Sequence, residues 1–169
     1  KSACDGQTQA CIIVKKTDSS GRIKNINIKD VTTRYCRQYG IHIKHADCVT
    51  LAGGPARYNG TWRAEDPNIF LYKVNNADLS GISSQYSAGH GIHLRYSNNV
   101  LVEDTAVKNN HHAGLRIGGA CSDVLAQDSD AHDNEDNGIE FITEGGDSPR
   151  FACIRTSSLH GNRGGAGLY

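Results

Sequence analysis

The sequence lacks several features that would place it in common classes of protein. No run of apolar residues approaches the roughly 18 that a transmembrane helix needs, so we expect no membrane partner. The 18 basic residues are balanced by 18 acidic residues, and this lack of a basic surplus argues against a nucleic-acid partner. No window has the sustained apolar spacing of an amphipathic helix, which argues against a helical fold.

Methionine is absent, and no segment has the pattern of a signal peptide, so we interpret the chain as a mature or trimmed form. Only three prolines accompany nineteen glycines, a balance that is typical of a turn-rich β protein. The 169 residues are expected to form one domain, with a cap over about residues 1–11.

A short repeat that begins with glycine is the most informative feature that the sequence does contain. Gly91, Gly114 and Gly138 each begin a Gly-apolar-x-apolar segment, at intervals of 23 and 24 residues. Gly40 begins an earlier copy, and Asn68 takes the place of glycine in the copy between Gly40 and Gly91. A repeat of this length with alternating apolar and polar residues predicts a solenoid of stacked β-strands.

Each repeat also predicts a second strand and a conserved type of turn. The second strands are expected at residues 26–28, 49–51, 77–79, 100–102 and 124–126. Asn110, Asn134 and Asn162 lie four or five residues before a glycine and predict a ladder of amide hydrogen bonds between coils.

Two repeats are longer than the others, and each is expected to carry an insertion. One is predicted near residues 53–67, where Asn59 begins the single Asn-x-Thr glycosylation sequon in a predicted loop, and the other near 145–150. Insertions in solenoids often edge a binding site. Because the chain stops at the first residues of a further coil, we expect an open C-terminal end, either in a fragment or in a homo-oligomer.

Six cysteines without a Cys-x-x-Cys pair favour disulfides in a secreted, extracellular protein. Cys121 and Cys153 fall at nearly the same phase of neighbouring coils, so stacking could bring them within bridging range. Three pairings remain open for the other four cysteines, which are Cys4, Cys11, Cys36 and Cys48.

Coils of about 23 residues, the Gly-Ile-x-Ile strand, the asparagine ladder and the second Val-x-Val strand resemble the right-handed parallel β-helix of pectate-lyase-like proteins. The resemblance covers roughly residues 11–169 and implies an all-β solenoid of about six coils. That superfamily includes polysaccharide lyases, uronan C5-epimerases, inverting hydrolases and non-catalytic adhesins, so the fold does not select an activity. The aspartate motifs of the hydrolase branch are absent from the first strand, and Asp66-Pro67-Asn68 lacks the histidine of the epimerase motif Asp-Pro-His.

Candidate site residues therefore come from the columns that stacking creates. The residues two positions after each repeat start are expected to form one outward row: His42, Phe70, His93, Arg116 and Glu140. Lys44, Tyr72 and Arg95 lie two positions further on. Five coils at a rise of ~4.8 Å span ~20 Å, which suits a groove for several sugar residues.

β-Elimination from a uronate needs a group that neutralises the carboxylate, a base for the C5 proton and an acid for the leaving oxygen. Arg116 is the candidate for the first role, through a bidentate contact. His93 is the candidate base because its pKa lies near neutrality, and Tyr72 or His42 is the candidate acid. Glu140 offers one carboxyl for inverting hydrolysis, a less favoured reaction that would need a second carboxyl from a loop, such as Glu144 or Asp147.

The expected partner is an acidic polysaccharide. It would meet Lys44, Arg95 and the loop residue Arg63, and it would stack on Phe70 or Trp62. No cofactor is required, although calcium is possible at an acid-rich turn. The carboxylates of that turn are Asp128, Asp130, Asp133, Glu135 and Asp136.

Together these patterns predict a secreted polysaccharide lyase that cleaves a uronate-containing polymer. One alternative is a non-catalytic glycan-binding or structural β-helix. A third possibility is a uronan C5-epimerase or an inverting glycoside hydrolase.

Overall fold

The computed structural model describes residues 10–16, 21–60 and 65–164. In these ranges the chain forms β-strands and no helix, and therefore no helix that could cross a membrane. The strands are β1 (Ala10–Val14), β2 (Ile23–Lys29), β3 (Thr33–Arg34), β4 (Tyr39–Ala52), β5 (Pro55–Arg57), β6 (Ile69–Ser80), β7 (Ser83–Gln85), β8 (Ile92–Arg95), β9 (Asn98–Glu103), β10 (Ala106–Lys108), β11 (Leu115–Gly118), β12 (Ser122–Gln127), β13 (Asp130–His132), β14 (Ile139–Ile142), β15 (Arg150–Arg155) and β16 (Ser158–His160).

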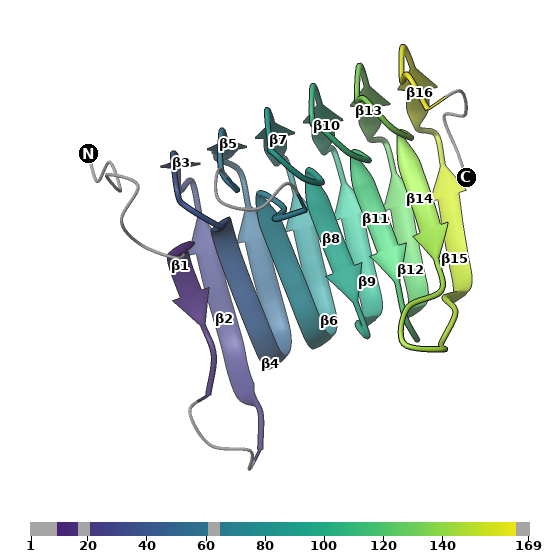
Figure 1. Cartoon of the computed structure of the whole chain (residues 1–169). Coiled ribbons are helices and arrows are strands. Elements are labelled where there is room, and N and C mark those ends of the chain that lie inside the picture. The colour runs from purple at the N-terminus through teal and green to yellow at the C-terminus, as the bar shows by residue number, and fades with distance from the viewer. Residues whose placement is uncertain (1–9, 17–20, 61–64, 165–169) are drawn as a thin grey trace.

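The strands stack in parallel along one axis, as the prediction of a β-solenoid of about six coils requires (Figure 1). A ten-stranded sheet contains both long strands of every coil, and β4 and β6 each run through both without interruption. A six-stranded sheet holds the short strands in the order β16-β13-β10-β7-β5-β3. The short strands form a row along the upper edge in Figure 1.

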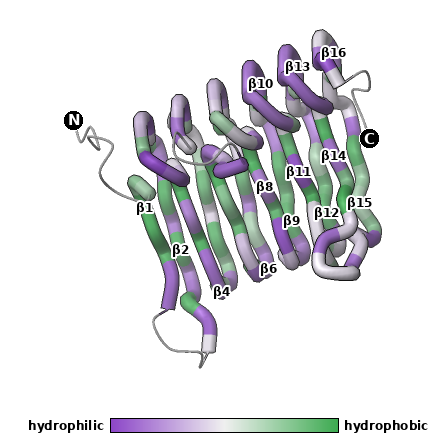
Figure 2. The backbone as a smooth tube through the Cα atoms, viewed as in Figure 1, coloured by the Kyte–Doolittle hydropathy of each residue, from purple (hydrophilic) through white to green (hydrophobic). Residues whose placement is uncertain are grey.

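The core consists of apolar columns that arise from the period-two pattern of the strands. One such column stacks in register and is at most 6 % exposed: Ile41, Ile69, Ile92, Leu115 and Ile139. Hydrophobic and hydrophilic residues alternate along the strands in Figure 2. Because successive side chains on a strand point to opposite faces, the residues between these apolar positions project outward.

A third strand in each coil was not predicted from the sequence. β5 lies within the expected insertion at 53–67, but it pairs in register with β3 and β7 and is a regular part of the coil. The extra residues of this coil therefore come after Asn59. The sequence signal was weak because these strands are two or three residues long, too short to establish a period.

The asparagine ladder is confirmed and includes a member that the prediction missed. Asn110 donates from Nδ2 to Asn134 Oδ1 at 2.9 Å, and Asn134 donates to Asn162 Oδ1 at 2.9 Å. Asn59 occupies the same column, accepts a hydrogen bond from Cys36 N and is 0 % exposed. Asn59 lies outside the strands, as predicted, but its side chain is buried in the ladder and is not accessible in the folded protein.

Asn134→Ala should cost about 3 kcal/mol of unfolding free energy, because the loss of a buried amide leaves several partners unsatisfied. Asn134 donates to Val107 O and Asn162 Oδ1 and accepts from the Asn110 backbone and side chain. Denaturant unfolding measures the loss, and Asn27→Ala, at an exposed outward position, should change stability by less than about 0.5 kcal/mol. Equal losses in the two variants would contradict a stabilising ladder.

The cysteine predictions are partly corrected. Cys11 and Cys36 form a disulfide with their Cα atoms 5.6 Å apart, whereas Cys48 is free and exposed, and Cys4 lies outside the described residues. Cys121 and Cys153 do not pair: Cys121 is buried and accepts a hydrogen bond from Ser97 N, while Cys153 is exposed. Cys153 pairs in register with Leu125, because the extra residues before β15 shift its phase.

Candidate functional site

The predicted outward row exists and is continuous across five coils. His42 pairs with Phe70, Phe70 with His93, His93 with Arg116 and Arg116 with Glu140. The ring centroids are 5.1 Å apart between His42 and Phe70 and 5.0 Å apart between Phe70 and His93. The register of the ladder therefore turns a sequence column into a surface of aromatic and charged side chains.

A cleft of about 670 Å³ lies over the middle of this row. Its lining residues are Tyr39, Glu65, Asp66, Pro67, Phe70, His90, His93, Arg95, Arg116 and Glu144. Phe70, His93, Arg95 and Arg116 were predicted for the site, so the structure brings four of the candidates together.

The other candidates lie at the margin of the cleft or away from it. His42 packs against both Tyr39 and Phe70, outside the lining. Lys44 lies over the Tyr72 ring, with Nζ 5.0 Å from its centroid. Glu140 Oε2 is 3.5 Å from Arg116 Nη1. Trp62 and Arg63 lie outside the described residues.

Glu144 lies at the centre of the charged cluster. Its Oε1 accepts a hydrogen bond from Arg116 Nε at 3.2 Å and is 3.3 Å from His93 Nε2. Its Oε2 lies 2.8 Å from Arg95 Nε. The contacts of His93 Nε2 and Arg95 Nε with Glu144 lack hydrogen-bond geometry, so the attraction between Arg95 and the carboxylate is one of charge. The cleft thus already holds a carboxylate between two guanidinium groups and an imidazole.

The loop between β14 and β15 places Glu144, and Figure 1 shows this loop projecting from the end of the two strands. Glu144 and Asp147 exchange backbone hydrogen bonds of 2.9 and 3.1 Å around Gly145 and Gly146, both at positive φ. Tyr96 Oη, from the turn between β8 and β9, donates a hydrogen bond to Glu144 O at 3.1 Å and so fixes the loop against an earlier coil. The sequence indicated this loop through the predicted insertion near 145–150 and offered Glu144 as a possible second carboxyl for hydrolysis, not as a partner of the arginines.

Burial and charge oppose each other at Glu144 and His93. Burial alone would raise the pKa of Glu144, but the contact with His93 and the charges of His93, Arg116 and Arg95 lower it overall. Burial lowers the pKa of His93, and the nearby Glu144 carboxylate reverses only part of this effect. Glu144 is therefore ionised. His93 stays neutral at pH values at which an ordinary imidazole would already be protonated.

His90 was not a candidate from the sequence, yet it positions Arg116. Its Nε2 lies 3.0 Å from Arg116 Nη1, and since a guanidinium can only donate, the imidazole nitrogen accepts. Burial, followed by the charges of His93 and Arg116, lowers the pKa of His90 to about 2. A neutral His90 therefore fixes one edge of the guanidinium while Glu144 contacts another.

The acid-rich turn does not converge on one point. Glu135 Oε2 lies 2.9 Å from His111 Nδ1, and Asp136 Oδ2 lies 2.8 Å from His112 Nδ1. Asp133 Oδ2 lies 2.7 Å from His132 Nδ1. Within the ranges that the structure describes, no group of three or more His, Cys, Asp or Glu side chains could hold a metal ion.

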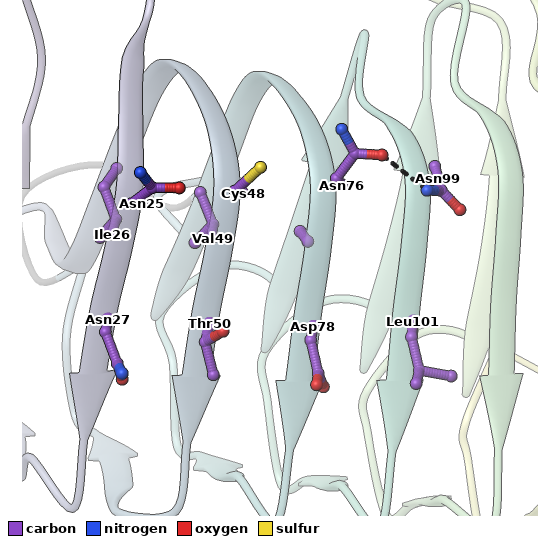
Figure 3. Close-up of a pocket in the computed structure, with 11 residues that line it drawn as sticks. Asn25, Ile26, Asn27, Cys48, Val49, Thr50, Asn76, Asp78, Asn99 and Leu101 are labelled. Atoms are coloured by element: carbon purple, nitrogen blue, oxygen red, sulfur yellow. Dashed lines mark hydrogen bonds between the residues drawn. The ribbon is translucent and has the colours of Figure 1, made fainter.

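A second hollow, of about 540 Å³, lies on the outward face of the second strands (Figure 3). Asn25, Cys48, Asn76 and Asn99 follow one corner of successive coils, and Asn99 donates to Asn76 Oδ1 at 2.7 Å. Asp78 is the one carboxylate among its lining residues, and no lysine, arginine or histidine is among them. The amides of this hollow could hydrogen-bond a ligand, but its lining does not combine a base with a cationic group. We therefore assign the candidate site to the cleft.

The comparisons with known proteins concern the fold. The family model "Right handed beta helix region" matches residues 10–169. The A-module of mannuronan C-5 epimerase AlgE4 from Azotobacter vinelandii is similar with a TM-score of 0.59 and 15% identity, over 86% of this chain and 45% of that one. The AlgE6 A-module from the same organism has a TM-score of 0.50 and 12% identity, over 88% and 54%.

At these identities the likeness shows a shared fold alone, and the chain spans about half the length of the two structures. No curated protein matches the sequence. The family match extends over almost the whole chain and agrees with the parallel solenoid that the coordinates show. The chain therefore belongs to the family of right-handed β-helix proteins.

Proposed function

We propose that the protein is a polysaccharide lyase that removes the C5 proton from a uronate residue of an acidic polymer. The observation that carries this proposal is that Arg95 and Arg116 both contact the carboxylate of Glu144 beside a buried, neutral His93. A uronate carboxylate has the same charge and shape as the Glu144 carboxylate. The cleft thus combines an anion-binding group with a base at one point.

Arg116 neutralises the uronate in this mechanism. Its Nε and Nη2 lie 3.2 and 3.1 Å from one oxygen of Glu144, so the guanidinium already presents two donors to a carboxylate. Withdrawal of charge from the carboxylate makes the C5 proton more acidic, because the developing carbanion is stabilised. The hydrogen bond to His90 holds the guanidinium in this orientation.

His93 accepts the C5 proton at Nε2, the nitrogen that faces the carboxylate site. In elimination the electron pair left at C5 forms a double bond to C4, and the C4–O bond breaks. The leaving oxygen then needs a proton. Tyr39 lines the cleft and is the acid that we assign, in place of Tyr72 and His42, which lie outside the lining.

Epimerisation is the second candidate function, and the structural likeness to two mannuronan C-5 epimerases favours it. It begins with the same proton removal and ends when a proton returns to the opposite face of C5. Hydrolysis needs a protonated carboxyl, and the lowered pKa of Glu144 does not suit this role, so a hydrolase would have to use Glu65 or Asp66 of the lining instead. A glycan-binding protein would keep the anion contacts but show no turnover.

Incubation in deuterated water with alginate, polygalacturonate, glucuronan and glycosaminoglycans distinguishes these functions. A rise in ultraviolet absorbance reports unsaturated uronate ends and supports the lyase. Deuterium at C5 of intact polymer, seen by NMR, identifies an epimerase instead. New reducing ends without unsaturation identify a hydrolase, and unchanged polymers that still bind the protein identify a binding module.

Glu144→Gln should lower KM for the acidic polymer about tenfold, because the carboxylate that competes for Arg95 and Arg116 is removed. Steady-state kinetics measure KM and kcat separately. Glu140→Gln is the matched control, since Glu140 makes only a longer contact with the same arginine. A KM that rises in Glu144→Gln would show that Glu144 assists binding and would contradict competition.

A further inference from the structure

The six-stranded sheet of short strands holds a column of cationic side chains, and this column does not belong to the cleft. Arg34 pairs in register with Arg57, Arg57 with Gln85 and Gln85 with Lys108. The residues that point inward on these strands are buried, so this column faces outward. Arg34 and Arg57 are exposed and Lys108 is partly exposed, whereas Gln85 between them is covered by its neighbours. Arg34, Arg57 and Lys108 form no ion pair with any residue in the described ranges. Three cations are therefore available within four coils, or ~14 Å.

A ladder of tyrosines runs along the corner next to this column. Tyr35, Tyr58 and Tyr86 directly follow the column residues, and they are 52 %, 42 % and 42 % exposed. Their centroids are 5.5 and 4.8 Å apart with interplanar angles of 12° and 5°. The guanidinium of Arg34 lies 6.0 Å from the Tyr35 ring centre, so cations and rings form one continuous surface.

The backbone at this corner suits other residues better than tyrosine. The three tyrosines have φ of 57°, 54° and 52°, and Asn109, Asp133 and Gly161 hold the corner in the next coils. Asparagine, aspartate and glycine adopt this left-handed conformation at low cost, whereas a tyrosine costs roughly 1–2 kcal/mol. The chain therefore accepts backbone strain in three successive coils for rings that remain exposed, which points to a role in binding.

A hollow of about 380 Å³ runs beside the ladder. All three tyrosines line it, and the small side chains of Ser87 and Ala88 lie at the same turn. The stack ends where Asn109 replaces a tyrosine, so one face of Tyr86 is left without a fourth ring. Glu135, which pairs with His111, lies at the far end of the hollow and would repel an anion there.

The cationic part of the column ends at Lys108, one coil beyond Tyr86, the last tyrosine of the ladder. His132 and His160 continue the column, but both contact Asp130, and His132 also contacts Asp133. The acidic partners are confined to these later coils. Cations and tyrosines thus lie side by side in the first four coils of this sheet, where the last two of these coils hold Gln85 beside Tyr86 and Lys108 beside Asn109.

We propose that Arg34, Arg57, Lys108 and the ladder of Tyr35, Tyr58 and Tyr86 form a second binding track for an acidic polysaccharide. The cations meet the carboxylates, while the tyrosine rings and hydroxyls contact the apolar and polar faces of the sugars. A net charge of zero makes this local cationic strip a poor match for nucleic acid, which needs many phosphate contacts. The inference rests on the proposed function only for the polymer class.

Binding of polygalacturonate and alginate in an Arg116→Ala background tests the track, because the cleft has then lost its carboxylate contact. Arg34→Ala combined with Arg57→Ala should weaken binding about five- to tenfold and reduce its salt dependence. Tyr58→Asn should weaken binding without lowering thermal stability, because asparagine is natural at this corner and relieves the strain. Arg155→Ala, at an exposed arginine on β15, is the matched control and should change neither.

The outcomes separate this inference from the proposed function. Loss of binding in the track variants, with no turnover of any polymer by the natural protein, would retain the track and reject the lyase. Turnover without any effect of the track variants on binding would reject the track alone. Equal binding of a single-stranded oligonucleotide through the same residues would overturn the assignment to polysaccharide.

Discussion

Arg116→Lys is expected to lower kcat/KM on the acidic polymer by a factor of about 100 or more. The guanidinium contacts Glu144 through Nε and Nη2, His90 through Nη1 and Glu140 through Nη1, and a lysine amine cannot reproduce this fork. The loss arises in the transition state, where negative charge develops on the uronate. Removal of one such donor typically costs 100- to 1,000-fold in rate, an order of magnitude that we adopt here.

The measurement is initial rate by ultraviolet absorbance, or by C5 deuterium incorporation where elimination is absent. Arg155→Lys makes the same chemical change on an exposed part of β15 and should leave the rate unchanged. The substitution at Arg116 should also release Glu144, so circular dichroism must establish that the fold is retained. Near-normal activity in a folded Arg116→Lys protein would show that a point charge is sufficient and would overturn the assigned role.

The outward row was predictable because parallel coils place residues of equal phase side by side. His93 and Arg116 differ by 23 positions in sequence, and the strand register makes them neighbours. The sequence alone therefore predicted that a histidine and an arginine lie side by side in the outward row. The same periodicity placed Phe70 and Arg95 in the cleft.

The remainder of the site depends on segments that have no period. Glu144 reaches the row from a loop, and its contact depends on the turn at Gly145 and Gly146 and on the anchor from Tyr96. His90 precedes the first strand of its coil, where a strand pattern does not define the direction of a side chain. Tyr39 lies one position before the repeat start, so the column analysis did not include it.

Length differences between coils explain the other errors. The bridge expected between Cys121 and Cys153 assumed an unchanged phase across the loop before β15, but the extra residues displaced Cys153 to the position opposite Leu125. Asn59 was not recognised as a member of the ladder because the insertion was placed too early in its coil. The period of the sequence predicts that coils form. The exact position of an insertion within a coil becomes known only from the strand pairing and hydrogen bonds on either side of it.

His93→Gln is expected to reduce turnover by about 100- to 10,000-fold, the usual range for loss of a general base. The acid side of the pH–rate profile gives a sharper test than the loss itself. Because burial lowers the pKa of His93, the natural protein should keep its activity as pH falls below 6.5, the ordinary value, and lose it when the imidazole gains a proton. Buried neutral histidines also make the fold less stable as pH falls below 6.5, so unfolding must be measured at each pH.

Glu144→Gln identifies the group that titrates. The Glu144 carboxylate raises the pKa of His93 against the effect of burial. Loss of this carboxylate should therefore move the acid limb of the pH–rate profile, where activity falls as His93 gains a proton, to a still lower pH. Lys44→Gln, a charge change beside Tyr72 and outside the cleft, should leave the limb in place. If His93 is the base, the limb moves with Glu144 and disappears in His93→Gln. A limb that is the same in all these variants would assign the proton transfer to another group and would remove His93 from the mechanism.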